Sequence, residues 1–163
     1  MNVNTESQVV DGRRYWRLLI DGRPTPNERL YATLAEATLH AQYVVGDRPF
    51  PPFVWGYLRA ALDTVDDALL GEGERFSLRA RAIAIEDCAT FREQNAIALA
   101  QTEWNDEMQH GADLWATRNG DSTAGFWNHD YTPEVAGQLT RAAQALGEQH
   151  VLADAESDKL ELI

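Results

Sequence analysis

The chain has 163 residues, of which 44% are hydrophobic and 25% are charged, a composition typical of a globular protein that buries a core. Its single cysteine, Cys88, excludes an internal disulfide and a multi-cysteine metal site, which fits a reducing compartment. Residues 1–8 lack the apolar core of a signal peptide, and no run approaches the ~18–20 apolar residues that span a bilayer. We therefore expect a cytoplasmic protein.

The charge is distributed unevenly along the chain. Residues 1–51 contain six arginines and six acidic residues, whereas residues 52–163 contain eight basic and twenty acidic residues and carry the whole net charge of −12. A field of this sign repels nucleic acid and anionic membranes and attracts basic surfaces. Direct nucleic-acid or membrane binding is therefore not expected, although an acidic surface can also serve solubility alone.

The first 51 residues are expected to form a small module with balanced charge. Residues 1–11 resemble a loose tail, and Arg13–Ile20 is aromatic and β-branched enough for a strand that ends in an Asp21-Gly22 turn. A second short strand is expected over residues 29–32. Thr33 and Glu36 form a capping box that opens a helix over residues 34–45. A proline-rich linker over residues 48–52 coincides with the charge boundary, so we expect domains at 1–51 and 52–163.

The acidic segment is expected to contain three helices. Apolar spacing predicts helices over residues 53–70 and, after a cap at Ser77, to about residue 101, with Cys88 buried. An acidic loop is expected over residues 103–110. Thr132 followed by Pro133 predicts the start of a third helix that continues to residue 146. Strands are expected over residues 150–155 and 160–163.

A hairpin over residues 113–127 is expected to organise this segment. Asn119-Gly120 is a strong turn signal, and Trp115, Phe126 and Trp127 flank it as candidate core residues. The predicted fold class is α+β, with an antiparallel sheet of two hairpins covered by about three helices. The N-terminal strand-turn-helix either adds to that sheet or forms a separate lobe.

Several stretches resemble an uncharacterised family of small bacteriophage and mobile-element proteins. They are residues 53–58, 86–91, 111–120 and 125–127, the last two giving Trp-Ala-Thr-Arg-Asn-Gly and Gly-Phe-Trp. The resemblance covers about residues 52–163. Asp121-Ser122-Thr123 replaces a His-Gly step that is usual in the family, and Leu114 stands where a phenylalanine is usual. The resemblance implies a phage setting and a shared fold, but no activity.

The polar residues around the predicted turn are candidates for a binding site. Arg118 could hold an anion. A carboxylate beside a histidine could serve as base and orienter, and Asp121 and Asp130 are the acidic residues near His129. Alternatively, Arg118 pairs with Asp121 or Asp130, and Asn119 and Asp121 satisfy turn backbone. No nucleophile with a placed base is identified, so no catalytic residue is assigned.

No metal or cofactor is expected. A site built from His110, Asp113, His129 and Asp130 is conceivable, but these residues do not follow a known ligand spacing. The sequence contains neither of the common glycine-rich phosphate loops, GxGxxG and GxxxxGK[ST].

Acidic clusters supply the remaining candidates for binding. On the predicted helix 53–70, Asp63, Asp66 and Asp67 share one face at i, i+3 and i+4, where like charges repel. Glu103, Asp106 and Glu107 form a second cluster. Such carboxylates are either a solvated face or an imitation of spaced phosphates.

The expected function is therefore that of a non-enzymatic phage or mobile-element accessory protein that binds a basic host protein. The partner could be a nucleic-acid enzyme, with the acidic surface acting as a DNA mimic that inhibits a defence nuclease, as anti-restriction and anti-CRISPR proteins do. Two alternatives stay open. One is a small enzyme or ligand-binding domain that uses the polar loop, and the other is a structural homo-oligomer, of which a homodimer is the simplest case.

Overall fold

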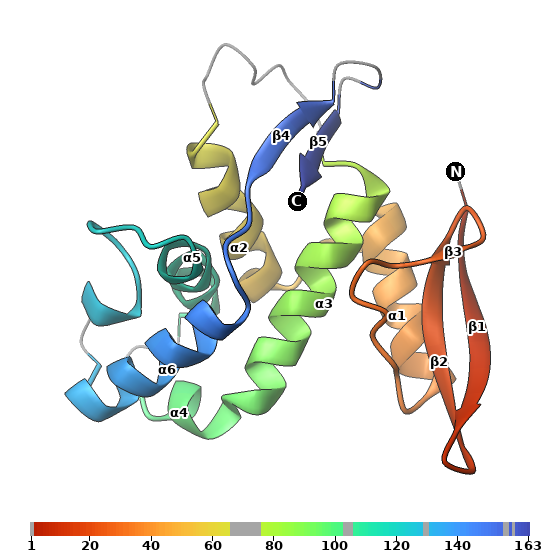
Figure 1. Ribbon diagram of the computed structural model, residues 1–163, viewed down its shortest axis with the longest axis horizontal. Helices are drawn as coiled ribbons and strands as arrows, with labels where there is room; N and C mark the ends of the chain where they lie inside the picture. The colour runs from red at the N-terminus through yellow and green to blue at the C-terminus, as the bar shows by residue number, and fades with distance from the viewer. Residues whose placement is uncertain (1, 66–75, 103–105, 129–130, 155–156, 158) are drawn as a thin grey trace.

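The computed structural model describes residues 2–65, 76–102, 106–128, 131–154, 157 and 159–163. Within these residues the fold is α+β, with six α-helices, a three-stranded N-terminal antiparallel sheet and a C-terminal hairpin (Figure 1). Helix α3 (Leu78–Gln94) lies in the middle of the molecule. It separates the N-terminal sheet and α1 (Leu34–Val45) from α2 (Pro52–Asp63), α5 (Glu107–Arg118) and α6 (Pro133–Ala145).

The N-terminal sheet contains β1 (Val3–Val10), β2 (Arg13–Ile20) and β3 (Arg23–Pro24) in that order. The predicted strand Arg13–Ile20 is confirmed, and positive φ angles at Asp21 (50°) and Gly22 (78°) form the predicted turn. The prediction of a loose tail over residues 1–11 was wrong, because Asp11-Gly12 forms a similar turn and lets β1 pair along the whole of β2.

The expected strand over residues 29–32 is reduced to a single bridge between Tyr31 and Trp16. After it, α1 begins at Thr33, whose hydroxyl accepts a hydrogen bond from the Glu36 N–H, and ends at Gly46 with φ of 88°. Both ends agree with the prediction, because a capping hydroxyl and a left-handed glycine satisfy the free backbone groups of a helix.

Helix α2 is shorter than the predicted helix 53–70. It ends at Asp63, since Thr64 closes the last turn with hydrogen bonds from its N–H and its hydroxyl to the Ala61 carbonyl. Helix α3 begins at Ser77 as predicted, and its side chain accepts from the Ala80 N–H. The predicted continuation to residue 101 is interrupted at Asn95, whose amide bonds the Phe91 carbonyl, and a separate α4 (Ala96–Ala100) follows.

The prediction of a hairpin over residues 113–127 was wrong. Instead, the chain forms α5, then a loop and a short 3-10 helix, η2 (Phe126–Asn128). Asp106 caps α5 by accepting hydrogen bonds from the N–H groups of Met108 and Gln109. Residues 107–110 therefore belong to the helix and not to an acidic loop. Asn119-Gly120 is a reversal, as expected, but it ends a helix, and only Gly120 has a positive φ (67°).

Two glycines explain how α2 and α5 pack. A Cβ at Gly56 would lie 1.9 Å from the Met108 carbonyl oxygen, and a Cβ at Gly111 would lie 1.9 Å from the Phe53 carbonyl oxygen. Each glycine therefore brings its helix into backbone contact with the other. The predicted core residues Trp115 and Phe126 are buried, but the prediction for Trp127 was wrong, because 48% of it is exposed.

The C-terminal elements follow the prediction closely. Thr132 caps α6, and after Gly147, at φ of 80°, the strands β4 (Val151–Asp154) and β5 (Lys159–Leu162) pair antiparallel. A bridge between Phe76 and Leu160 joins this hairpin to the start of α3. The two sheets are separate, so the predicted single sheet of two hairpins is not formed. None of the helices in the described ranges is long and apolar enough to cross a membrane.

The proposed division of the chain near residues 48–52 stays a prediction. Across it, Thr25 donates to Glu86, Asn27 donates to Asp87 and Arg29 donates to Thr90, all of them hydrogen bonds onto α3. Leu18, Tyr31 and Val44 from the first 51 residues are fully buried in the same core. The two segments are therefore tied together by polar as well as apolar contacts.

Candidate functional site

Arg118, the central residue of the predicted polar loop, is buried at the end of α5. Its Nε donates to the Gly147 carbonyl at 2.8 Å and its Nη2 to the Leu146 carbonyl at 3.2 Å. Its Nη1 donates to the Tyr57 hydroxyl at 2.6 Å, to Asp87 at 2.7 Å and to Gln149 at 3.2 Å. Arg118 therefore joins α2, α3, α5 and the end of α6.

The neighbours of Arg118 also bond to the protein itself. The Thr117 hydroxyl accepts from the Phe126 N–H at 2.9 Å, and the Asn119 side chain accepts from the Gln149 N–H at 2.8 Å. Gly125 leaves room for this contact, since a Cβ there would lie 2.5 Å from the Thr117 hydroxyl. The residues of the Thr-Arg-Asn-Gly and Gly-Phe-Trp stretches thus hold the loop after α5 in place.

Asp121 organises the exposed turn of the same loop. Its carboxylate accepts hydrogen bonds from the Thr123 N–H and hydroxyl, both at 2.7 Å, and from the Ala124 N–H. These bonds lower the pKa of Asp121. The expected pairing of Arg118 with Asp121 is not formed, since Arg118 pairs with Asp87. His129 and Asp130 lie outside the described residues.

The conceivable metal ligands are also engaged in other contacts. His110 lies 3.3 Å from the Thr102 hydroxyl, and Asp113 accepts hydrogen bonds from Gln109 and from the Tyr131 hydroxyl. Over the part of the chain that the structure describes, no group of three or more His, Cys, Asp or Glu side chains could hold a metal ion. Cys88 is fully buried as predicted, and burial raises the pKa of its thiol.

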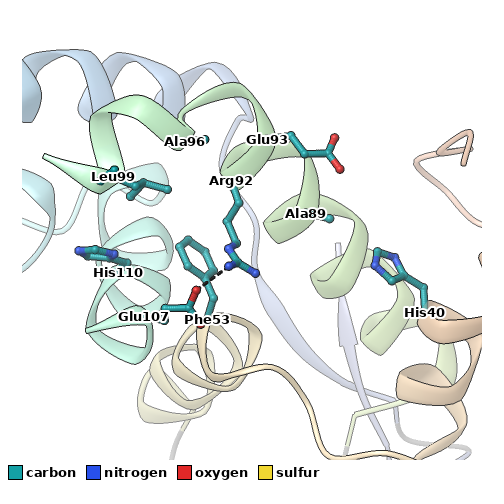
Figure 2. Close-up of a pocket in the computed structure, with 10 residues that line it drawn as sticks. His40, Phe53, Ala89, Arg92, Glu93, Ala96, Leu99, Glu107 and His110 are labelled. Atoms are coloured by element: carbon teal, nitrogen blue, oxygen red, sulfur yellow. Dashed lines mark hydrogen bonds and ion pairs between the residues drawn. The ribbon is translucent and has the colours of Figure 1, made fainter. Parts of the chain in front are cut away.

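A cleft of about 600 Å³ lies elsewhere, between the helices, and the sequence did not indicate it. Figure 2 shows side chains from α1, α2, α3, α4 and α5 around it. The lining residues are His40, Phe53, Ala89, Arg92, Glu93, Ala96, Leu99, Ala100, Glu107 and His110. Because five helices contribute to it, no local spacing in the sequence could predict the cleft.

The centre of the cleft is an ion pair. Arg92 on α3 donates to Glu107 at the start of α5, with 2.5 Å between Nη2 and Oε1, and the Arg92 guanidinium lies 5.5 Å from the centre of the Phe53 ring (Figure 2). Both charged side chains are partly exposed, at 41% for Arg92 and 37% for Glu107. Glu107 is one of the predicted binding residues.

The two histidines of the cleft are uncharged near neutral pH. Burial, together with the positive charge of Arg29, lowers the pKa of His40 to about 4, and burial lowers the pKa of His110. The permanent charges near the cleft are therefore those of arginines and carboxylates. Arg29 forms ion pairs with Glu36 and Glu93, and Arg92 forms one with Glu107. Asp106, exposed beside Glu107, adds a further negative charge.

The predicted acidic residues are brought together only in part. Asp106 and Glu107 begin α5 at the cleft, whereas Asp63 is the last residue of α2, where it lies 3.9 Å from Arg59. Because α2 ends there, the i, i+3, i+4 arrangement of Asp63 with Asp66 and Asp67 is not supported by a described helix. Asp66, Asp67 and Glu103 lie outside the described residues.

Comparison of the chain with protein-family models, with curated proteins and with solved structures finds no match.

Proposed function

We propose that this protein is a non-enzymatic accessory protein of phage or mobile-element origin that binds a basic host protein in the cytoplasm. The observation that carries the proposal is the charge distribution: residues 52–163 hold the entire net charge of −12, and residues 1–51 are neutral. A charge concentrated in one part of the chain favours a directed interaction, because it steers a basic partner toward that part.

The acidic rim of the cleft is the proposed contact surface. This rim is defined by Glu93 and Glu107, which line the cleft, and by the exposed Asp106 next to Glu107 in the chain. His40 and His110 add no positive charge to it because their pKa values are lowered. A lysine or arginine of the partner would meet a local excess of carboxylates there. Phe53 and Leu99 also line the cleft as largely buried apolar side chains, and Arg92 lies over the Phe53 ring.

DNA mimicry is the specific form of this proposal that we favour. A host enzyme that handles nucleic acid has a basic groove, and carboxylates at suitable spacing would occupy that groove in place of phosphates. The setting implied by the resemblance to phage proteins is consistent with inhibition of a host defence nuclease.

The alternative of a small enzyme built on the polar loop has less support. Two of its four residues have structural partners: Arg118 bonds to groups from four parts of the fold, and Asp121 orders its own turn. A site for an anion needs donors that face the ligand, and the Arg118 guanidinium is directed into the protein.

The experiment is a pull-down from host lysate at low and high salt, with two charge variants of equal net charge. One variant combines Glu93→Gln, Asp106→Asn and Glu107→Gln on the rim. The control combines Asp11→Asn, Glu28→Gln and Asp47→Asn, three exposed acids of the N-terminal module. Both remove three negative charges, and asparagine keeps the cap at residue 106.

We expect the rim variant to lose most of the partner captured by the wild-type protein, and the control to retain it. Capture by the wild-type protein should fall steeply with salt, because interactions between exposed charges are screened within ~8–10 Å at physiological ionic strength. Capture that does not depend on salt, or an equal loss in both variants, would contradict the proposal.

A further inference from the structure

Strand β1 forms an open edge of the N-terminal sheet. The strand order is β1-β2-β3, and β1 lies at the rim of the molecule, on the far side of α3 from α5 and α6 (Figure 1). Its pairing with β2 runs one-to-one from Val3↔Ile20 to Val10↔Arg13, without a bulge. The strand contains neither proline nor lysine, the residues that commonly protect such an edge.

The hydrogen bonds identify which backbone groups of β1 face outward. The Asn2 carbonyl accepts from the Asp21 N–H at 2.9 Å, so the backbone polar groups of Asn2 point toward β2. In an antiparallel pair, every second residue along β1 then bonds to β2, and the residues between them point their polar groups outward. Trp16, which lies opposite Ser7, makes both of its backbone hydrogen bonds with Tyr31 and none with Ser7. Val3, Thr5, Ser7 and Val9 therefore direct their N–H and C=O groups away from the sheet. Among the described residues, no backbone hydrogen bond outside the β1–β2 ladder reaches these groups.

We propose that β1 pairs antiparallel with β1 of a second copy of this chain, around a two-fold axis at Ser7. A two-fold axis normal to the sheet keeps each residue on its face, so only residues of the same parity can be opposite. With Ser7 at the axis, Thr5 lies opposite Val9 and Glu6 lies opposite Gln8. A shift by one position, with the axis at Glu6, would put two Glu6 carboxylates opposite each other, which is unfavourable.

The charge distribution favours a second copy as the occupant of this edge. The acidic excess belongs to residues 52–163, whereas the N-terminal module is neutral and Glu6 is bonded to Arg17 at 2.6 Å. Pairing through β1 joins two copies at their neutral ends, with α3, α5 and α6 of each copy on the side away from the interface. It also covers Val9, which is 66% exposed, with Thr5 of the other copy.

The first test measures the mass of the protein by sedimentation velocity, with Ser7→Pro as the disrupting variant. The Ser7 N–H faces outward, so proline there removes a bond between copies and none between β1 and β2. Ser7→Ala is the control because it keeps the N–H. We expect a concentration-dependent dimer of the 18.3 kDa chain for the wild type and Ser7→Ala, and a folded monomer for Ser7→Pro. A wild-type monomer at the highest attainable concentration would overturn the proposal.

The second test checks the register with two variants that place opposite charges at residue 8. Glu6 and Gln8 of the other copy would form a non-hydrogen-bonded pair, in which side chains lie closest. Gln8→Lys should tighten the dimer and Gln8→Glu should weaken it, with dissociation constants about three- to thirtyfold apart. High salt should narrow the difference. Equal dissociation constants for the two variants would overturn the proposed register, and a dimer that persists in Ser7→Pro would show that β1 is not the interface.

Discussion

A Cβ on Gly111 would lie 1.9 Å from the carbonyl oxygen of Phe53, far closer than two non-bonded heavy atoms can approach. Gly111→Ala should therefore force α2 and α5 apart and lower the free energy of unfolding by about 3 kcal/mol or more. Urea denaturation followed by circular dichroism measures this loss.

Gly137 on α6 is the control for that prediction. A Cβ at Gly137 meets only the end of the Arg141 side chain, at 3.3 Å, and that side chain can move. Gly137→Ala should leave stability unchanged or raise it by up to about 1 kcal/mol, because alanine favours a helix. Equal effects of the two substitutions would contradict the close contact between α2 and α5.

Removal of the Arg118 side chain should strongly destabilise the protein. Arg118→Ala leaves the Asp87 carboxylate, 13% exposed, without its charged partner, and removes the guanidinium donor from Tyr57 and Gln149, which keep only the hydrogen bond between them. We expect a loss of about 3–5 kcal/mol in the free energy of unfolding, as when one partner of a buried ion pair is removed.

Arg118→Lys should recover only part of that stability. Lysine restores the charge, but its single ammonium group cannot also reach the carbonyls of Leu146 and Gly147. If Arg118→Ala unfolded at the same urea concentration as the wild type, the structural role of this arginine would be wrong, and a role in ligand binding would regain support.

Glu86 should make the protein less stable as the pH rises from about 4.5 to about 7. Glu86 is fully buried, and burial raises its pKa from 4.5 to about 7 despite a hydrogen bond from Thr25. Between these values the folded state binds the proton more tightly than the unfolded state does. The contribution of Glu86 to the free energy of unfolding is therefore fully present below pH 4.5 and is lost by about pH 7, a change of up to about 3 kcal/mol.

Glu86→Gln isolates this contribution. Glutamine still accepts from Thr25 but does not titrate, so the variant should gain stability relative to the wild type between pH 5 and pH 8. The comparison is needed because His40, with its pKa lowered to about 4, destabilises the fold below pH 6.5 in both proteins. A stability difference between variant and wild type that stays constant with pH would show that Glu86 does not titrate in this range.

The two tryptophans near the end of α5 should respond very differently to truncation. Trp115 is 4% exposed and packs edge-to-face on Tyr57 with ring centres 5.2 Å apart, whereas Trp127 is 48% exposed. Trp115→Ala should cost about 3–5 kcal/mol, and Trp127→Ala should cost much less. Thermal unfolding of both variants tests the packing of α5, and a similar fall in melting temperature would contradict it.

The capped starts of three helices were the most predictable part of this fold. Thr33, Ser77 and Thr132 cap the helices that the sequence assigned to them, because a capping side chain bonds to backbone only two or three residues away. Gly46 and Gly147 ended helices for an equally local reason. Local chemistry of this kind does not depend on the rest of the fold.

Helix α5 was missed because its signals depend on tertiary packing. Leu114, Trp115, Ala116, Thr117 and Arg118 are all buried, so no polar face alternates with an apolar one along this part of the helix. Gly111 resembles a turn residue in the sequence but marks the crossing with α2. Its cap, Asp106, stands among other acids and could not be distinguished from them.

The candidate site was predicted only in part, because its other residues come together through tertiary packing. Asp106 and Glu107 were identified from their charge, whereas Arg92 and Phe53, which face Glu107 across the cleft, lie far from it in the sequence. Arg118 was identified as important, but its role is structural, since its partners Asp87, Leu146 and Gln149 come from distant segments.

The carboxylate of Asp87 has a consequence for local opening of the molecule. One of its oxygens accepts from Asn27 of the N-terminal module at 2.8 Å, and the other accepts from Arg118 at 2.7 Å. Opening on either side of α3 therefore removes one of the two bonds that fix the position of the Asp87 side chain for the other side. Amide hydrogens of β2 and of α5 should exchange with solvent at similar free energies of opening. In Asp87→Ala this shared anchor is absent, so the difference between the two regions in free energy of opening should increase.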